Sequence, residues 1–208
     1  MPLVTLPPTG SAAAITDSLP SGISQYGPAV LFKSGAINVS TQGTLGRVTS
    51  SASIAGVADG PGPFLYQSVG STCTASDEGV TGSTSLNGAV LETKYDVNTQ
   101  EPIASVALAA SPAVNTELFG TIDHVGDRFR VVLNEQIKNA DGSLTVNAAH
   151  MYLLGPIAVG EMIIGQSVCG MSAADPSTLS QAPAVAWLRV LGSAPSPVPP
   201  IRLWPAPP

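Results

Sequence analysis

The stretch that decides the fold is Arg128–Leu154, RFRVVLNEQIKNADGSLTVNAAHMYLL. Its first part alternates in polarity: Phe129, Val131 and Leu133 fall on one face, Arg128, Arg130, Asn134 and Gln136 fall on the other, and Val132 is the one apolar exception. This period is typical of a half-buried strand. Asp141–Gly142 then forms a typical hairpin turn, because glycine accepts a positive φ at no steric cost. We expect one long antiparallel hairpin over Arg128–Leu154.

The returning run of this hairpin is expected to place alternate residues on one face, namely Leu144, Val146, Ala148, His150, Tyr152 and Leu154. Further strands are predicted at Ala36–Gln42, Arg47–Val57, Gly79–Leu86, Ile103–Ala109 and Glu161–Cys169. Several short strands separated by turn signals indicate an all-β, antiparallel β-sandwich, with a barrel as the less favoured alternative. A helix is considered only around Ala182–Leu191, where Pro183 suits a first turn.

Charge is scarce in this chain of 208 residues. Charged residues make up 11% of it, against about 25% in an average soluble protein, so the exposed faces of a mainly helical protein have too few residues to cover them. The net charge of −6 leaves no cationic surface for phosphates, which argues against nucleic acid as a partner. The longest apolar stretch, Met151–Gly165, is interrupted by Gly155, Pro156 and Glu161 and is too short to span a membrane.

The composition changes near Asp175. Nine of the nineteen prolines lie in residues 176–208, where proline removes backbone donors and fixes φ, so this segment is expected to be extended. We divide the chain into a β-sandwich module, residues 1–175, and a Pro/Trp-rich arm, residues 176–208. A disordered tail is the alternative for the arm. Because a solvated linker rarely carries tryptophan, we expect the arm to bind grooves of its own domain or of a neighbouring subunit through Trp187, Val198, Ile201, Arg202, Leu203 and Trp204.

Cys73 and Cys169 are the two cysteines of the chain. Taken alone, they are either two buried thiols or one disulfide, and two distant histidines cannot complete a metal site with them. If they are bridged, closing so long a loop stabilises the fold by up to ~4.7 kcal/mol in the chain-entropy model.

Six strings in order carry a family resemblance. They are Gly35–Gly43, Val48–Val57 (VTSSASIAGV), Cys73–Ser76 with Val80–Thr84, Leu133–Gln136, Asp141–His150 (DGSLTVNAAH) and Ile163–Cys169. Together they resemble the choice-of-anchor P family, secreted or surface-displayed modules of actinobacteria rich in serine, threonine and glycine. The resemblance covers about residues 3–169. It implies an exported β-rich module without known catalytic activity, in which Cys73 and Cys169 are paired.

The departures from the family shape the functional expectation. Family members usually begin with a signal peptide and an additional strand, and after the second cysteine they usually stop or lead into an anchor. This chain instead starts with Met1 at the matching segment and continues after Cys169 into the arm. We expect a non-catalytic structural or interaction protein on a virion surface, a capsid-decoration or tail component of an actinobacteriophage attached through its arm. The alternative is a secreted actinobacterial cell-surface module, extracellular or in the cell wall, that serves in adhesion or in glycan or protein binding. Expected partners are neighbouring subunits, further copies of the chain, or a capsid or surface scaffold.

Catalytic and metal-binding candidates are few. His150 is read as a core or sheet histidine bonded to a neighbour rather than as a general base, and Asp123–Asp127, around His124, as an exposed hairpin tip rather than a cation site. Asp96–Gln100 begins like a calcium loop but has no glutamate at the closing position. Ser167 lacks the second glycine of a nucleophile elbow. We therefore expect no catalytic residue, no metal and no cofactor.

Overall fold

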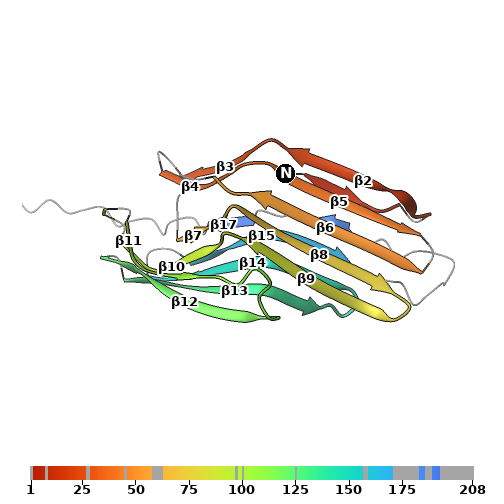
Figure 1. Ribbon diagram of the computed structural model, residues 1–208. Coiled ribbons are helices and arrows are strands. Elements are labelled where there is room, and N and C mark those ends of the chain that lie inside the picture. Colours follow the sequence, from red (N-terminus) through yellow and green to blue (C-terminus); the bar gives the residue numbers. More distant parts are fainter. Residues whose placement is uncertain are drawn as a thin grey trace, which may run out of the picture.

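The computed structural model describes residues 2–7, 9–26, 29–44, 46–57, 63–96, 98–99, 101–124, 126–156, 159–170, 183–185 and 189–192. Every regular element in these residues is a β-strand. The strands lie in two facing layers (Figure 1). The all-β, sandwich-like fold expected from the sequence is therefore confirmed.

One layer, the small sheet, has five strands in the order β2-β5-β6-β8-β9, each antiparallel to its neighbours. They are β2 (Ser11–Leu19), β5 (Ile37–Thr44), β6 (Arg47–Ala55), β8 (Ser68–Ser76) and β9 (Gly79–Asn87). A separate two-stranded ladder of β3 (Gly22–Tyr26) and β4 (Ala29–Ser34) precedes β5.

The other layer, the large sheet, has the order β11-β10-β12-β13-β14-β15-β17, with β7 paired to β10. Its strands are β7 (Phe64–Leu65), β10 (Val90–Asp96), β11 (Glu101–Ala107), β12 (Thr116–Asp123), β13 (Asp127–Lys138), β14 (Leu144–Leu154), β15 (Val159–Cys169) and β17 (Arg189–Gly192). Among the described strands, the pair β10 and β12 is the one that runs parallel. A second small ladder joins β1 (Leu3–Thr5) to β16 (Pro183–Val185).

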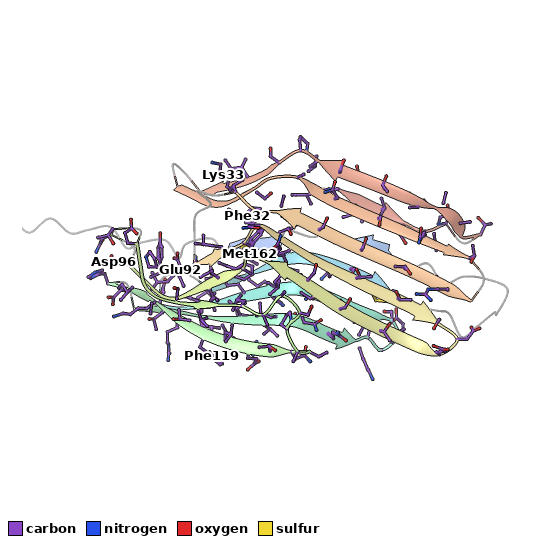
Figure 2. All side chains as sticks on the ribbon, viewed as in Figure 1. Phe32, Lys33, Glu92, Asp96, Phe119 and Met162 are labelled. Atoms are coloured by element: carbon purple, nitrogen blue, oxygen red, sulfur yellow. A yellow bond between two sulfur atoms is a disulfide. The ribbon has the colours of Figure 1, made fainter. Side chains whose placement is uncertain are left out.

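The core lies between the two layers and follows from the alternation of the strands. Phe129, Val131 and Leu133 of β13 face Ile54 and Val69 of the small sheet in one buried cluster, and burying each such side chain contributes about 1.5–3 kcal/mol. Figure 2 shows the side chains that fill the space between the layers, among them the labelled Phe32 and Met162.

The opposite face of the small sheet carries hydroxyl groups. Its strand registers align them in rows across the sheet, one of which is Thr16, Ser40, Ser51, Thr72 and Ser83. Ser40 Oγ and Ser51 Oγ lie 2.8 Å apart, and Thr49 Oγ1 and Thr74 Oγ1 lie 3.3 Å apart. Short hydroxyl side chains suit a pleated, half-solvated surface, so this layer needs almost no charge.

The two cysteines form a disulfide. Cys73 in β8 and Cys169 at the end of β15 have Cα atoms 5.5 Å apart, and neither cysteine is exposed. Ala75, Leu144 and Val146 pack around the bridge in a second buried cluster. The bond therefore ties the small sheet to the large sheet, and the pairing implied by the family resemblance is confirmed.

The long hairpin and the other predicted strands are also present. β13 and β14 pair from Phe129–Leu153 to Lys138–Leu144. In the turn, Asp141 Oδ1 accepts hydrogen bonds from Ser143 N at 2.9 Å and Ser143 Oγ at 2.7 Å, while Gly142 has a φ of 83°. Each strand predicted outside the hairpin begins and ends within two residues of the corresponding observed strand.

The single face predicted for the returning strand is wrong beyond Ala148. Met151 lies opposite Val131 and Ala149 opposite Leu133, so these residues enter the core, whereas His150 and Tyr152 lie opposite Val132 and Arg130 on the outer face. Nearer the turn, Val146 and Leu144 point inward as expected. The alternation therefore reverses between Ala148 and Ala149.

The cause is a row of residues across the large sheet, which we call the inversion line: Asn115, just before β12, Asn134 in β13, Ala148 in β14 and Gly165 in β15. Asn115, Asn134 and Gly165 have left-handed φ angles of 56°, 49° and 63°. Ladder pairs on either side place Asn134 and Gly165 level with Ala148, and Asn115 N donates to Asn134 O at 3.0 Å. A left-handed residue within a strand bends it and re-aims the side chains that follow.

The C-terminal segment differs from the expectation where it is described. The helix considered at Ala182–Leu191 is wrong for the described positions, because Pro183–Val185 and Arg189–Gly192 form the strands β16 and β17. These pair with β1 and β15 through backbone groups. The residues predicted to bind a partner, Trp187, Val198, Ile201, Arg202, Leu203 and Trp204, lie outside the described residues.

Candidate functional site

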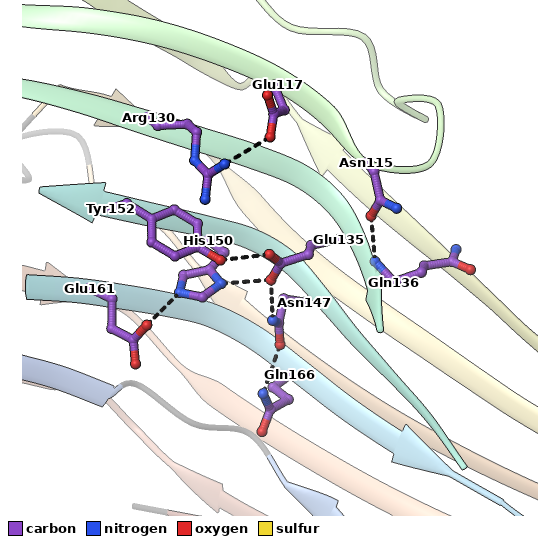
Figure 3. Close-up of polar contacts among 10 residues, drawn as sticks. All are labelled: Asn115, Glu117, Arg130, Glu135, Gln136, Asn147, His150, Tyr152, Glu161 and Gln166. Carbon is purple, nitrogen blue, oxygen red and sulfur yellow. Dashed lines mark hydrogen bonds and ion pairs between the residues drawn. The ribbon is translucent and has the colours of Figure 1, made fainter. Parts of the chain in front are cut away.

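A group of bonded polar side chains lies on the outer face of the large sheet, next to the inversion line. We call it the outer cluster; it consists of Glu135, Asn147, His150, Tyr152, Glu161 and Gln166. Figure 3 shows that they come from three adjacent strands, β13, β14 and β15. Strand pairing therefore places them in neighbouring positions of one sheet.

Glu135 is the centre of the outer cluster. Its Oε2 accepts a hydrogen bond from Asn147 Nδ2 at 2.6 Å and lies 2.6 Å from His150 Nδ1, and its Oε1 accepts one from Tyr152 OH at 2.8 Å. Burial of this carboxyl opposes ionisation, but the hydrogen bonds from His150, Asn147 and Tyr152 outweigh it and lower the pKa of Glu135. The carboxylate is thus held ionised by its neighbours.

His150 lies between two carboxylates. Its Nε2 is 3.2 Å from Glu161 Oε2, so each ring nitrogen faces a carboxylate oxygen. Only a ring protonated on both nitrogens donates to both oxygens. The side chain of His150 is 7% exposed and that of Glu161 is 29% exposed. His150 therefore lies in the interior of the cluster, and Glu161 lies at its solvent-exposed edge.

Tyr152 covers this histidine. The two rings stack with centroids 3.9 Å apart, and the guanidinium of Arg130 lies 4.2 Å from the centroid of Tyr152. Burial, and then the hydrogen bond to Glu135, raise the pKa of Tyr152, so its hydroxyl remains a donor. Arg130 Nη1 in turn pairs with Glu117 Oε1 at 3.0 Å.

The amide side chains extend the cluster toward β15. Gln166 Nε2 donates to Asn147 Oδ1 at 2.8 Å, and Asn147 is 1% exposed. Asn147 and His150 are three positions apart, so in a regular strand they would point to opposite faces. The reversal at Ala148 turns both toward Glu135, and the outer cluster therefore depends on the inversion line.

This arrangement links three strands through side chains that bond to one another. Glu135 has both oxygens engaged, and its partners come from β14. A buried, fully bonded polar network rigidifies the structure around it.

A second buried glutamate, Glu92 in β10, differs from Glu135 because its Oε2 has no hydrogen-bond partner. Burial, followed by the repulsion of Glu101, raises the pKa of Glu92.

The other sequence candidates lie apart from the outer cluster. His124 is at the β12–β13 turn, with Nε2 3.4 Å from Asp96 Oδ2, and it is half-exposed. Asp96 Oδ1 accepts hydrogen bonds from the backbone N of Asn98 and Thr99, which is an ordinary Asx turn. Ser167 is fully buried and accepts a hydrogen bond from Ser71 Oγ at 2.9 Å.

Two absences apply to the described part of the chain. Within it, no three His, Cys, Asp or Glu side chains are arranged to hold a metal ion. The same residues contain no helix with the length and apolar character that crossing a membrane requires.

Sequence reasoning found His150 but not its partners. It gave Glu135 no role of its own and placed His150 on the same face as Val146 and Ala148. One signal was available: Gly165 interrupts a predicted strand, and a glycine in that position often marks a bulge.

Comparison with known proteins gives no relative for this chain: no family model matches it, and searches of curated proteins and of solved structures return no match. The resemblance to the choice-of-anchor P family stays a prediction.

Proposed function

We propose that the chain is a non-catalytic structural module displayed on an outer surface. The observation that carries this proposal is the buried Cys73–Cys169 bridge between the two sheets. Disulfides of this kind form and persist in oxidising surroundings, outside the cytoplasm. A module that acts outside the cell, without chaperones to restore it, gains from a covalent tie between its layers.

The outer cluster supports a structural rather than a catalytic role. Its histidine, which would be the natural general base, has both ring nitrogens engaged by carboxylates. Its tyrosine donates to a buried carboxylate and is covered by Arg130. Groups that are bonded to one another in this way hold strands together.

We further propose that the surface is that of a virion, where the module serves as a capsid-decoration or tail component and is attached through residues 176–208. The apolar residues and tryptophans of that segment suit binding to grooves on a neighbouring subunit or scaffold. Supporting this, the described parts of the segment already bind the module by strand pairing.

A cell-surface module is the second candidate, favoured by the ordered strings that resemble the choice-of-anchor P family. It differs from the first in location, while the fold and the disulfide are common to both. Adhesion, or binding of a glycan or protein, would then be its role.

Electron microscopy with gold-labelled antibodies against the folded, oxidised module tests both candidates. Intact cells of the source organism and particles released from it are labelled in parallel. Regular labelling of particles supports the virion role, and labelling of the cell envelope supports the cell-surface role. Labelling confined to the interior of lysed cells, together with free thiols on Cys73 and Cys169 in the native protein, would overturn the proposal of an external module.

A further inference from the structure

The outer face of the small sheet, which is turned away from the large sheet (Figure 1), carries almost no charge. Arg47 is the one charged residue in the four ladder rows that cross this face, and the rows contain no aromatic residue. The rows are Ser18–Asn38–Ser53–Gly70–Ser85, Thr16–Ser40–Ser51–Thr72–Ser83, Gln42–Thr49–Thr74–Thr81 and Thr44–Arg47–Ser76–Gly79. Depletion of charge is typical of the centre of a binding surface, but protein–protein contacts also favour aromatic residues. This face therefore suits a hydroxyl-rich ligand better than a protein.

A hollow lies at one end of the face, where β5 ends and β6 begins beside β2. Its volume is about 160 Å³, and it is lined by Ala12, Gln42, Gly43, Thr44, Arg47 and Thr49. Pockets that enclose a whole small molecule measure roughly 300–1,000 Å³ and are mainly apolar. This hollow is smaller and has no large apolar side chain in its lining, so it fits one polar unit of a larger ligand whose remainder lies along the rows.

Arg47 sets the charge of that unit. Its side chain is exposed, and the ion pairs among the described residues are made by other side chains. The carboxylate of Asp77 approaches the preceding Gly46, where its Oδ2 lies 3.5 Å from the position of an added Cβ, but Asp77 does not line the hollow. A guanidinium binds a carboxylate through two parallel, charge-assisted hydrogen bonds. The unpaired Arg47 therefore favours a carboxylate in the hollow.

The other polar groups of the lining match hydroxyls. The amide of Gln42 and the hydroxyls of Thr44 and Thr49 each donate and accept hydrogen bonds, as the hydroxyls of a sugar do. Thr49 Oγ1 also lies 3.3 Å from Thr74 Oγ1, so the hydrogen-bonding groups of the hollow continue into the adjoining row. A sugar ring that carries a carboxylate presents both kinds of group to this lining.

We propose that the hollow binds a uronic acid unit of an acidic polysaccharide, with its carboxylate on Arg47 and the neighbouring sugar units along the hydroxyl rows. This inference rests on the proposed display on an outer surface, because polysaccharides of this kind are met outside the cell. It gives the small sheet a role of its own, separate from the outer cluster on the opposite layer.

Isothermal titration calorimetry with the full-length, oxidised protein tests the proposal. The probes are a linear oligomer of four glucuronic acid units, a neutral oligomer of four glucose units and a peptide of four glutamates. We expect the glucuronic acid oligomer to bind more tightly than either of the others, because it alone supplies both the carboxylate and the ring hydroxyls. Its affinity should fall as salt is added, since the contact with Arg47 is exposed to solvent.

Substitution of Arg47 shows where the oligomer binds. Arg47→Gln should weaken binding by about tenfold or more, because it removes hydrogen bonds between charged groups. Arg47→Lys should recover only part of the affinity, because an ammonium lacks the planar fork of a guanidinium. Arg128→Gln is the matched control: Arg128 is also exposed but lies in β13 of the large sheet, so binding should be unchanged. Circular dichroism of each variant verifies the fold.

Three results would overturn the proposal: no heat of binding with the glucuronic acid oligomer at millimolar concentration, equal binding of the glucose oligomer or the glutamate peptide, or equal losses in Arg47→Gln and Arg128→Gln. None of them affects the antibody labelling of particles or cell envelopes. A failed sugar site and a failed surface assignment are therefore distinguishable.

Discussion

The strands of the small sheet carry two charged residues, Asp17 and Arg47, whereas β13 of the large sheet alone carries five. The small sheet presents rows of hydroxyls in regular registers, apart from a shift between Ser11 and Ile15 in β2. In the large sheet, β13, β14 and β15 cross the inversion line and carry the outer cluster beside it. Several of the few charged residues lie in the large sheet, where they form ion pairs and hydrogen bonds with one another. The stability of the small sheet should therefore be insensitive to pH, and that of the large sheet should depend on a few ionised groups.

The largest expected effect comes from removing the bond between the two sheets. Replacing both cysteines, Cys73→Ala with Cys169→Ala, should lower the free energy of unfolding by about 2–5 kcal/mol, because the unfolded chain is then free of a loop of 96 residues. Urea unfolding followed by circular dichroism measures the loss. Unchanged stability would show that the two layers hold together without the bridge.

Next in size is the loss of the centre of the outer cluster. Glu135→Ala leaves His150 and Asn147 buried without this acceptor, and leaving buried donors unsatisfied in this way costs about 1–3 kcal/mol. Glu117→Ala is the matched control, since its pair with Arg130 is half-exposed and should contribute no more than about 1 kcal/mol. Equal effects of the two substitutions would contradict a special role for Glu135.

A smaller effect is expected at the inversion line. Gly165→Ala should cost about 1–2 kcal/mol for its left-handed φ, and more because the added Cβ would lie 3.2 Å from the Cβ of Ala148. Gly142→Ala, in the hairpin turn, has a similar φ and open space around it, so the difference between the two variants isolates the crowding. Thermal unfolding of both variants measures it, and a larger loss at Gly142 would argue against close packing at Ala148.

The smallest expected effect is that of pH on the unmodified protein. The pKa of Glu135 is lower in the folded state than in the unfolded chain, so its contribution is complete above its ordinary pKa of about 4.5 and is lost as the pH falls through the lower, folded value. The urea midpoint should be flat just below neutrality and decline in acid, less steeply in Glu135→Ala. Parallel profiles for the two proteins would show that another group controls the acid limb.

The sequence predicted the sheet class and the hairpin because period-two alternation and Asp141–Gly142 are local signals. It did not predict the strand at Ser11–Leu19, whose residues are mostly small and exposed, nor β10, where the alternation is interrupted by buried Glu92. The outer cluster was out of reach for a different reason. Its geometry depends on a reversal at Ala148, which Asn134 and Gly165 impose from the neighbouring strands. The sequence of one strand does not show which residues of another strand will lie beside it, so this reversal could not be predicted.

The ladder between β1 and β16 joins Leu3–Thr5 to Pro183–Val185, so most of the other strands lie between the two partners in the sequence. Contacts this far apart in sequence slow folding, because loop closure precedes any gain from pairing. During synthesis, Leu3–Thr5 gains this ladder partner only after β16 has been made. Pairing of these two strands should therefore be a late step in folding, and a growing chain stalled before Pro183 should lack this ladder.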